Sequence, residues 1–126
     1  MDDARSPREA GFAALVAGAF AVVVGLGLSR HEPWLDELQA YAIAAFASGP
    51  ADLLARLAYE GHPPLWHGLI WLATRAAPGI ATMQGLAGAI AIATCFLLAW
   101  KAPFPRYQRA LLCFGYYPLF EYGVIA

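Results

Sequence analysis

Residues 79–100 read GIATMQGLAGAIAIATCFLLAW and contain no charged side chain. As an α-helix this stretch rises about 33 Å, enough to cross the roughly 30 Å hydrocarbon core of a bilayer. Residues 11–28, GFAALVAGAFAVVVGLGL, form a second uncharged run, and residues 110–126 form a third apolar run with one acid. The three runs predict an all-α, polytopic transmembrane helical protein with membrane helices at about 11–28, 79–100 and 110–126.

The composition supports the same class. The chain of 126 residues is 60% hydrophobic and only 13% charged, whereas a soluble domain carries about 25% charged residues. The formal net charge is −1 and no basic stripe is present, so no nucleic-acid partner is expected. Cys95 and Cys113 lie inside apolar runs without metal-ligand or redox spacing, which predicts two small buried hydrophobic side chains.

The first apolar run follows two basic residues, Arg5 and Arg8. A cleaved signal peptide is one interpretation of such a pattern. The run is long for a signal peptide, and no small-x-small cleavage site follows Leu28. The pattern therefore favours a retained anchor whose N-terminus is cytoplasmic.

Residues 29–78 are the polar part of the chain and predict short helices. The segment 34–48 is bounded by Pro33 and by Gly49-Pro50, and a second helix runs from Pro50 to about Tyr59. Apolar residues gather on one side of the first helix, which indicates a membrane or protein surface. Residues 65–77 are apolar but too short to span comfortably, and predict a re-entrant or interfacial helix.

The basic residues between the last two runs set the predicted topology. Lys101, Arg106 and Arg109 have no acid among them, and the positive-inside rule places this loop in the cytoplasm. An even number of crossings then precedes the loop, so residues 29–78 form one external loop with juxtamembrane helices. The third run would carry Glu121 towards the outer face. Because Ala126 lies within an apolar run, we expect the chain to be a fragment of a longer membrane protein.

Three groups of polar residues are candidates for chemistry on the outer face. Asp36 and Glu37 begin a predicted helix, where acids commonly stabilise the helix dipole but also suit a general base. Glu60 and His62 precede two prolines, which equally fits a structural turn. Glu121 lies in an apolar run, where an acid is by default a functional candidate. His62 and His67 leave a divalent metal site open, although two histidines are weak evidence for one.

In this order, three motifs resemble the N-terminal part of the GT-C superfamily of membrane glycosyltransferases. They are the doublet Asp36-Glu37, the stretch EGHPPL at 60–65 and the stretch FEYGVIA at 120–126. The similar branch contains protein mannosyltransferases and bacterial transferases that decorate lipid A or polysaccharides. The resemblance extends over most of the chain, from Gly11 to Ala126.

The resemblance implies an enzyme that takes a sugar from a polyprenyl-phosphate-linked donor. The acceptor would be a glycan, lipid or protein on the periplasmic face of the bacterial inner membrane. Asp36 would be the catalytic base, Glu37 its neighbour in acceptor or metal contact, and Glu60, His62 and Glu121 substrate-binding residues. Family members continue for hundreds of residues, so this chain alone is not expected to complete a donor site. The alternative is a non-catalytic small membrane protein or a transporter fragment.

Overall fold

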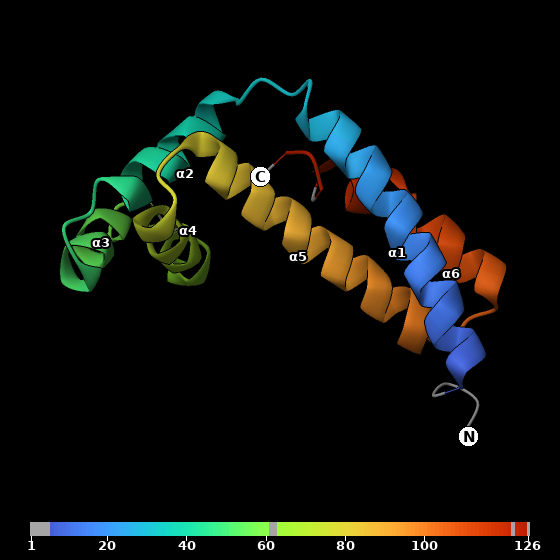
Figure 1. Cartoon of the computed structure of the whole chain (residues 1–126). Coiled ribbons are helices and arrows are strands. Elements are labelled where there is room, and N and C mark those ends of the chain that lie inside the picture. The colour runs from blue at the N-terminus through green and yellow to red at the C-terminus, as the bar shows by residue number, and fades with distance from the viewer. Residues whose placement is uncertain (1–5, 61–62, 122, 126) are drawn as a thin grey trace. The chain divides into compact units, whose positions relative to one another are not determined.

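The computed structural model describes residues 6–60, 63–121 and 123–125, and its regular structure over these residues is entirely helical. The helices form two compact units. The hairpin unit consists of the chain up to His31 and from Ala87 onward, and the loop unit is Glu32–Leu86. Figure 1 labels the helices of both units. The all-α prediction is confirmed for the described residues.

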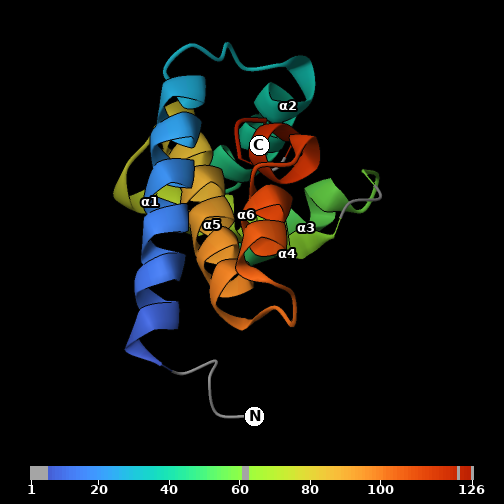
Figure 2. The ribbon, with the colours of Figure 1, turned by 90° about the vertical axis from the view of Figure 1, so that its right-hand side faces the viewer.

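The hairpin unit contains two long apolar helices, α1 (Pro7–Leu28) and the part of α5 (Ile80–Lys101) from Ala87 onward. Ser6 caps α1, because its hydroxyl accepts the backbone N–H of Glu9 at 3.3 Å. The two helices run side by side in opposite directions (Figures 1 and 2). A Cβ atom on Gly88 would lie 3.1 Å from the Leu28 side chain, so this glycine permits the close approach of the helices. The predicted helices at 11–28 and 79–100 are therefore present.

The core of the hairpin unit is made mostly of small and medium apolar side chains around one large ring, that of Phe20. It consists of Ala13, Val16, Phe20 and Val24 of α1, Ala91, Cys95 and Ala99 of α5, and Cys113. Both cysteines are free and buried, as the sequence predicts. The thiol of Cys113 donates to the backbone carbonyl of Cys95, with sulfur and oxygen 3.6 Å apart.

Both long helices keep most of their apolar surface outside this core. Helices α1 and α5 are long and apolar enough to cross a membrane, yet only 28% of the most apolar stretch of each is buried. Leu15, Val22 and Leu26 of α1 and Leu97 of α5 are among the exposed apolar side chains. A core helix of a soluble protein buries such a face, whereas these two helices leave it exposed.

The last part of the chain differs from the predicted continuous helix over 110–126. Helix α6 spans Arg106–Cys113, and a π-helical turn, η2, follows at Tyr117–Glu121. Two residues explain the break. The backbone N–H of Gly115 donates to the carbonyl of Leu112, three residues earlier, at 3.3 Å, which tightens the chain into a turn. Pro118 has no N–H to donate to the carbonyl four residues earlier. A crossing at this position stays a prediction, because its backbone is not one α-helix over the described residues.

The loop unit contains three short helices, α2 (Leu35–Ala45), α3 (Pro50–Leu57) and α4 (Pro64–Ala76), with the start of α5. Proline stands at the first position of α3 and α4, where its missing N–H costs nothing. Gly79 has φ = 134°, a left-handed value that favours glycine, and it forms the turn between α4 and α5. The predicted short helices are thus confirmed within a few residues.

Helix α4 packs against both α2 and α3. The carbonyl of Ala47, just beyond the end of α2, accepts the indole N–H of Trp71 at 3.1 Å. The guanidinium of Arg75 donates to the same carbonyl and lies over the Trp71 ring, 5.1 Å from its centroid. These contacts satisfy a carbonyl at the end of α2 that has no partner within the helix.

Candidate functional site

The predicted acid doublet divides into a buried and an exposed carboxylate. Both residues lie in the first turn of α2. Glu37 is only 1% exposed, and its carboxylate accepts the backbone N–H of Trp34 at 2.7 Å. This bond closes the start of the helix and gives Glu37 a structural role. Asp36 is exposed, with its carboxylate at the positive end of the helix dipole.

Glu60 is attached to the same helix. The side-chain amide of Gln39 donates to its carboxylate at 2.7 Å, across 21 positions in the chain. Asp36 and Gln39 are three residues apart on α2, and such residues are neighbours on a helix surface. The structure therefore brings Glu60 towards the stretch of α2 that carries Asp36, and both remain accessible to solvent.

The other predicted residues are less closely connected with Asp36. His62 lies outside the described residues, while His67 is buried in α4. Glu121 belongs to the hairpin unit, where it is the last residue of η2. A common site for Glu121 and Asp36 stays a prediction. Within residues 6–60, 63–121 and 123–125, no three His, Cys, Asp or Glu side chains are grouped to hold a metal ion.

Another acid of the loop unit, Asp52, has several hydrogen-bond donors around its carboxylate. Its Oδ2 accepts the backbone N–H and the hydroxyl of Ser48 at 2.8 and 3.2 Å. Its Oδ1 accepts the Nε–H of Arg56 at 3.1 Å. The backbone N–H of Ser48 and the guanidinium of Arg56 hold the pKa of Asp52 below its ordinary value. Asp52 thereby anchors the start of α3.

The most connected charged group was not singled out from the sequence. Glu9 and Arg109 are each only 8% exposed. One carboxylate oxygen of Glu9 accepts from Arg106 at 2.5 and 2.8 Å, and the other accepts from Arg109 at 2.8 Å. Arg109 also donates to the carbonyl of Ala99 at 2.6 Å. The cluster joins the start of α1, the end of α5 and the start of α6.

A local sign of the Glu9 cluster exists in the sequence. Ser6 and Glu9 have the Ser-x-x-Glu spacing of a capping box, which predicts that the Glu9 side chain turns back to the helix start. In the structure it instead binds arginines 97 and 100 positions away. The ring of Phe12, one turn further along α1, lies 5.5 and 5.4 Å from the Arg106 and Arg109 guanidinium carbons. The spacing is a signal for the acid but gives no sign of its distant partners.

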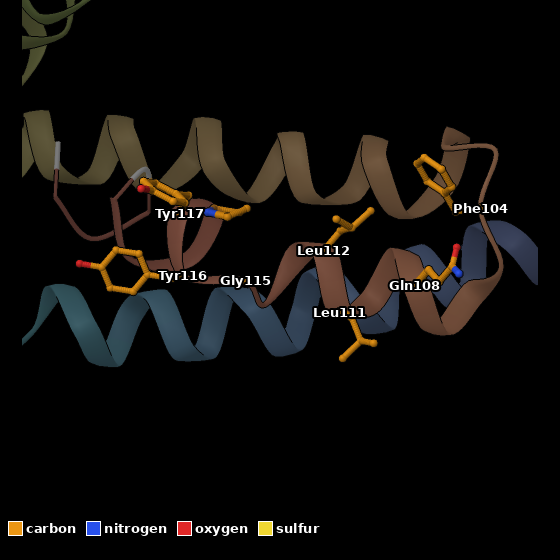
Figure 3. A pocket seen from close by; sticks show the side chains of 8 residues that line it. Phe104, Gln108, Leu111, Leu112, Gly115, Tyr116 and Tyr117 are labelled. Atoms are coloured by element: carbon orange, nitrogen blue, oxygen red, sulfur yellow. The ribbon is translucent and has the colours of Figure 1, made fainter.

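An apolar groove is lined by residues of α6, η2 and the adjoining loops. It was also not predicted. Its volume is about 560 Å³. Its lining includes Phe104, Gln108, Leu111, Leu112, Tyr116 and Tyr117. Figure 3 shows Phe104 and Gln108 at one end of this row and Tyr116 and Tyr117 at the other. The signal for it in the sequence is the spacing of Gln108, Leu111 and Leu112, which places them on one face of a helix.

No family model, curated protein or solved structure matches this chain. Its function is therefore argued from its own residues.

Proposed function

We propose that α1 and α5 cross a membrane and that the chain is part of a multi-pass inner-membrane protein. The supporting observation is that both helices expose an apolar face. Only 28% of the most apolar stretch of each helix is buried. The hydrocarbon core of a bilayer removes such a face from water without contact to another protein. The expected test is carbonate extraction of isolated membranes, in which the chain stays in the pellet. Its release into the supernatant would contradict the crossing.

The proposed orientation places residues 6–9 and 101–109 in the cytoplasm. The Glu9 cluster supports one part of this topology, because it holds the start of α1 beside the end of α5. The start of α1 and the end of α5 are thus on the same side of the proposed membrane, as two crossings between them require. Labelling of a cysteine introduced at Phe104 from the cytoplasmic side tests the orientation. Labelling from the outer side would reverse it.

We further propose that the parent protein is a glycosyltransferase of the GT-C type. It would move a sugar from a polyprenyl-phosphate donor to an acceptor on the outer face. The observation that supports this best is the pair of carboxylates at the start of α2. Glu37 is buried and fixes the helix start, whereas Asp36 is exposed in the first turn. A fixed helix start beside an accessible carboxylate is suited to a positioned general base.

The proposed reaction is a single displacement. Asp36 takes the proton of the acceptor hydroxyl while that oxygen forms a bond to the anomeric carbon. The bond between the anomeric carbon and the phosphate oxygen breaks, and the polyprenyl phosphate leaves with the electron pair. The configuration at the anomeric carbon inverts. Glu60, His62 and Glu121 are proposed to contact the substrates.

The test is Asp36→Asn in the full-length protein. Membranes containing it are incubated with polyprenyl-phosphate-linked hexoses and pentoses, and the release of free polyprenyl phosphate is measured. General-base catalysis typically contributes about 10²–10⁴-fold, so a loss of that size is expected with unchanged membrane insertion. Glu32→Gln, at an exposed acid of the same unit, is the matched control. Full activity of Asp36→Asn would refute the assigned role.

The alternative proposal is a non-catalytic membrane subunit or a transporter piece. The specific observation in its favour is the outer face of α5, where Ala81, Gly85 and Ala89 are exposed at four-residue spacing. Small residues at this spacing permit close helix–helix packing in a bilayer. Gly85→Leu should then disrupt an assembly on native electrophoresis, while Asp36→Asn changes nothing. The opposite pair of results supports the transferase.

A further inference from the structure

We propose that the α6 side of the hairpin unit binds an anionic phospholipid, with the phosphate at the cationic end of α6 and one acyl chain in the apolar groove. The proposal rests on the proposed membrane crossing but not on the transferase activity. The main observation behind it is that Phe104 lines the apolar groove and also lies in the chain between two cations, Lys101 and Arg106. These cations belong to a group of basic residues, the rim, at this end of α6.

The rim is cationic even after its internal ion pairs are counted. Arg8, Lys101, Arg106 and Arg109 lie at this end, against the single described carboxylate of Glu9, which leaves a net charge of +3. Arg8 and Lys101 are exposed, and the Arg106 side chain is 50% exposed although it binds Glu9. Lysine and arginine near an anionic membrane surface each attract it by about 1 kcal/mol.

The aromatic residues at this end fit the level of lipid headgroups. The ammonium of Lys101 lies 3.7 Å from the centroid of the Trp100 ring, and Phe104 and Tyr107 are exposed close by in the chain. Aromatic side chains are enriched where a membrane protein meets the interface. Phe104 also lines the groove, and the rim cations Lys101 and Arg106 flank it in the chain.

The groove supplies the reason why the ligand is a lipid rather than a soluble anion. Its lining side chains are apolar apart from the Gln108 amide and the tyrosine hydroxyls. It extends along α6 from Phe104 towards Tyr117 (Figure 3), so an acyl chain of a lipid whose phosphate binds at the rim would enter it at the Phe104 end. A free phosphate would use the rim alone, whereas a phospholipid fills both features. Charge complementarity selects an anionic headgroup over a zwitterionic one.

The primary experiment measures retained lipids on the unaltered chain. The chain is reconstituted in nanodiscs that contain phosphatidylcholine and phosphatidylglycerol with the same acyl chains, and bound lipids are counted by native mass spectrometry. Phosphatidylglycerol should be retained preferentially, and Lys101→Gln should reduce this preference about fivefold. Arg30→Gln, which removes an exposed cation beyond the other end of α1, should leave it unchanged.

A second pair of variants tests the groove. Leu111 is 69% exposed and Leu15, on α1 away from the groove, is 75% exposed, so serine at either position opens no core cavity. Leu111→Ser should lower the retention of phosphatidylglycerol severalfold, and Leu15→Ser should not. Quenching of Trp100 by brominated phosphatidylglycerol, in a chain with the other three tryptophans replaced by phenylalanine, gives a second measurement in the intact bilayer.

Several results would overturn the lipid site. They are equal retention of the two lipids, an equal effect of Lys101→Gln and Arg30→Gln, or unchanged binding in Leu111→Ser. Displacement of the lipid by inorganic phosphate would likewise mean an anion site without a chain-binding groove. Failure of the chain to enter the nanodisc is a separate result, because it contradicts the membrane crossing as well.

Discussion

Two glutamates occupy the same helical position in the two units and have different partners. Glu9 is the third residue of α1 in the hairpin unit, and Glu37 is the third residue of α2 in the loop unit. Both are buried. Glu37 turns back to the backbone N–H of Trp34, three residues earlier. Glu9 instead binds Arg106 and Arg109, close to the opposite end of the chain.

The difference shows what a local pattern can and cannot indicate. A glutamate at this position has a nearby donor at the helix start in every case. Two guanidinium groups outcompete that single N–H at Glu9, because hydrogen bonds between ionised partners are about twice as strong as neutral ones. At Glu37 the local bond to the backbone N–H of Trp34 is formed.

The largest effect is expected from Glu9→Gln. The substitution removes the carboxylate that pairs both arginines and leaves the buried Arg109 charge without it. We expect the thermal midpoint in detergent to fall by more than about 5 °C, monitored by tryptophan fluorescence. Glu32→Gln, which changes an exposed acid, is the control and should have almost no effect. Equal midpoints for both variants would show that the Glu9 cluster adds no stability.

A smaller effect is expected from Arg109→Lys, which keeps the charge but removes the guanidinium fork. Arg109 uses separate nitrogens for the carbonyl of Ala99 and for Glu9. A lysine is a point charge and cannot reproduce this geometry. The midpoint should fall by about 2–5 °C, and Arg106→Lys at the half-exposed partner should cost less. A fully stable Arg109→Lys protein would mean that charge alone holds the cluster.

The matching change in the loop unit is Glu37→Ala. Losing a capping interaction at a helix start costs about 1 kcal/mol, which should appear as faster hydrogen exchange in the first turn of α2. Glu37→Gln keeps an acceptor oxygen and should restore most of the protection. Asp36→Ala should change stability by less than about 0.5 kcal/mol, because its side chain is exposed. Similar losses for Asp36→Ala and Glu37→Ala would contradict the division of the doublet.

The smallest effect is expected on the loss of stability at low pH, to which Asp52 contributes. Its folded pKa is held below its ordinary value by the Ser48 N–H and Arg56. The stabilisation is therefore complete above the ordinary aspartate pKa of about 3.9 and is lost as the pH falls through the lowered folded value. Helicity measured by circular dichroism during acid titration should show this loss, and Asp52→Asn should lack that component. Identical titrations of the two proteins would remove Asp52 as the anchor of α3.

Much of the helix pattern follows from local sequence. The charge-free runs predicted α1 and α5, and Gly49-Pro50 predicted the end of the first short helix and the start of the second. The segment 110–126 was less predictable, since its apolar composition resembles a spanning helix while Gly115 and Pro118 interrupt the hydrogen bonds. The sequence predicted which residues are candidates for the site. It did not predict that Asp36 and Glu37 have separate roles, because these roles depend on the burial of each side chain. The positions of two adjacent acids in the sequence do not show which of them is buried.

The sequence by itself determined that this chain is helical, that two of its helices can cross a membrane and that its charges lie between apolar runs. Composition and period suffice for these properties because they depend on residues that are neighbours in the chain. Tertiary structure alone decided that Glu9 binds Arg106 and Arg109 and that a groove follows α6. It also decided that Glu60 is bound to Gln39. These contacts join distant residues, and only the packing of the helices determines which of the available partners come within hydrogen-bond distance.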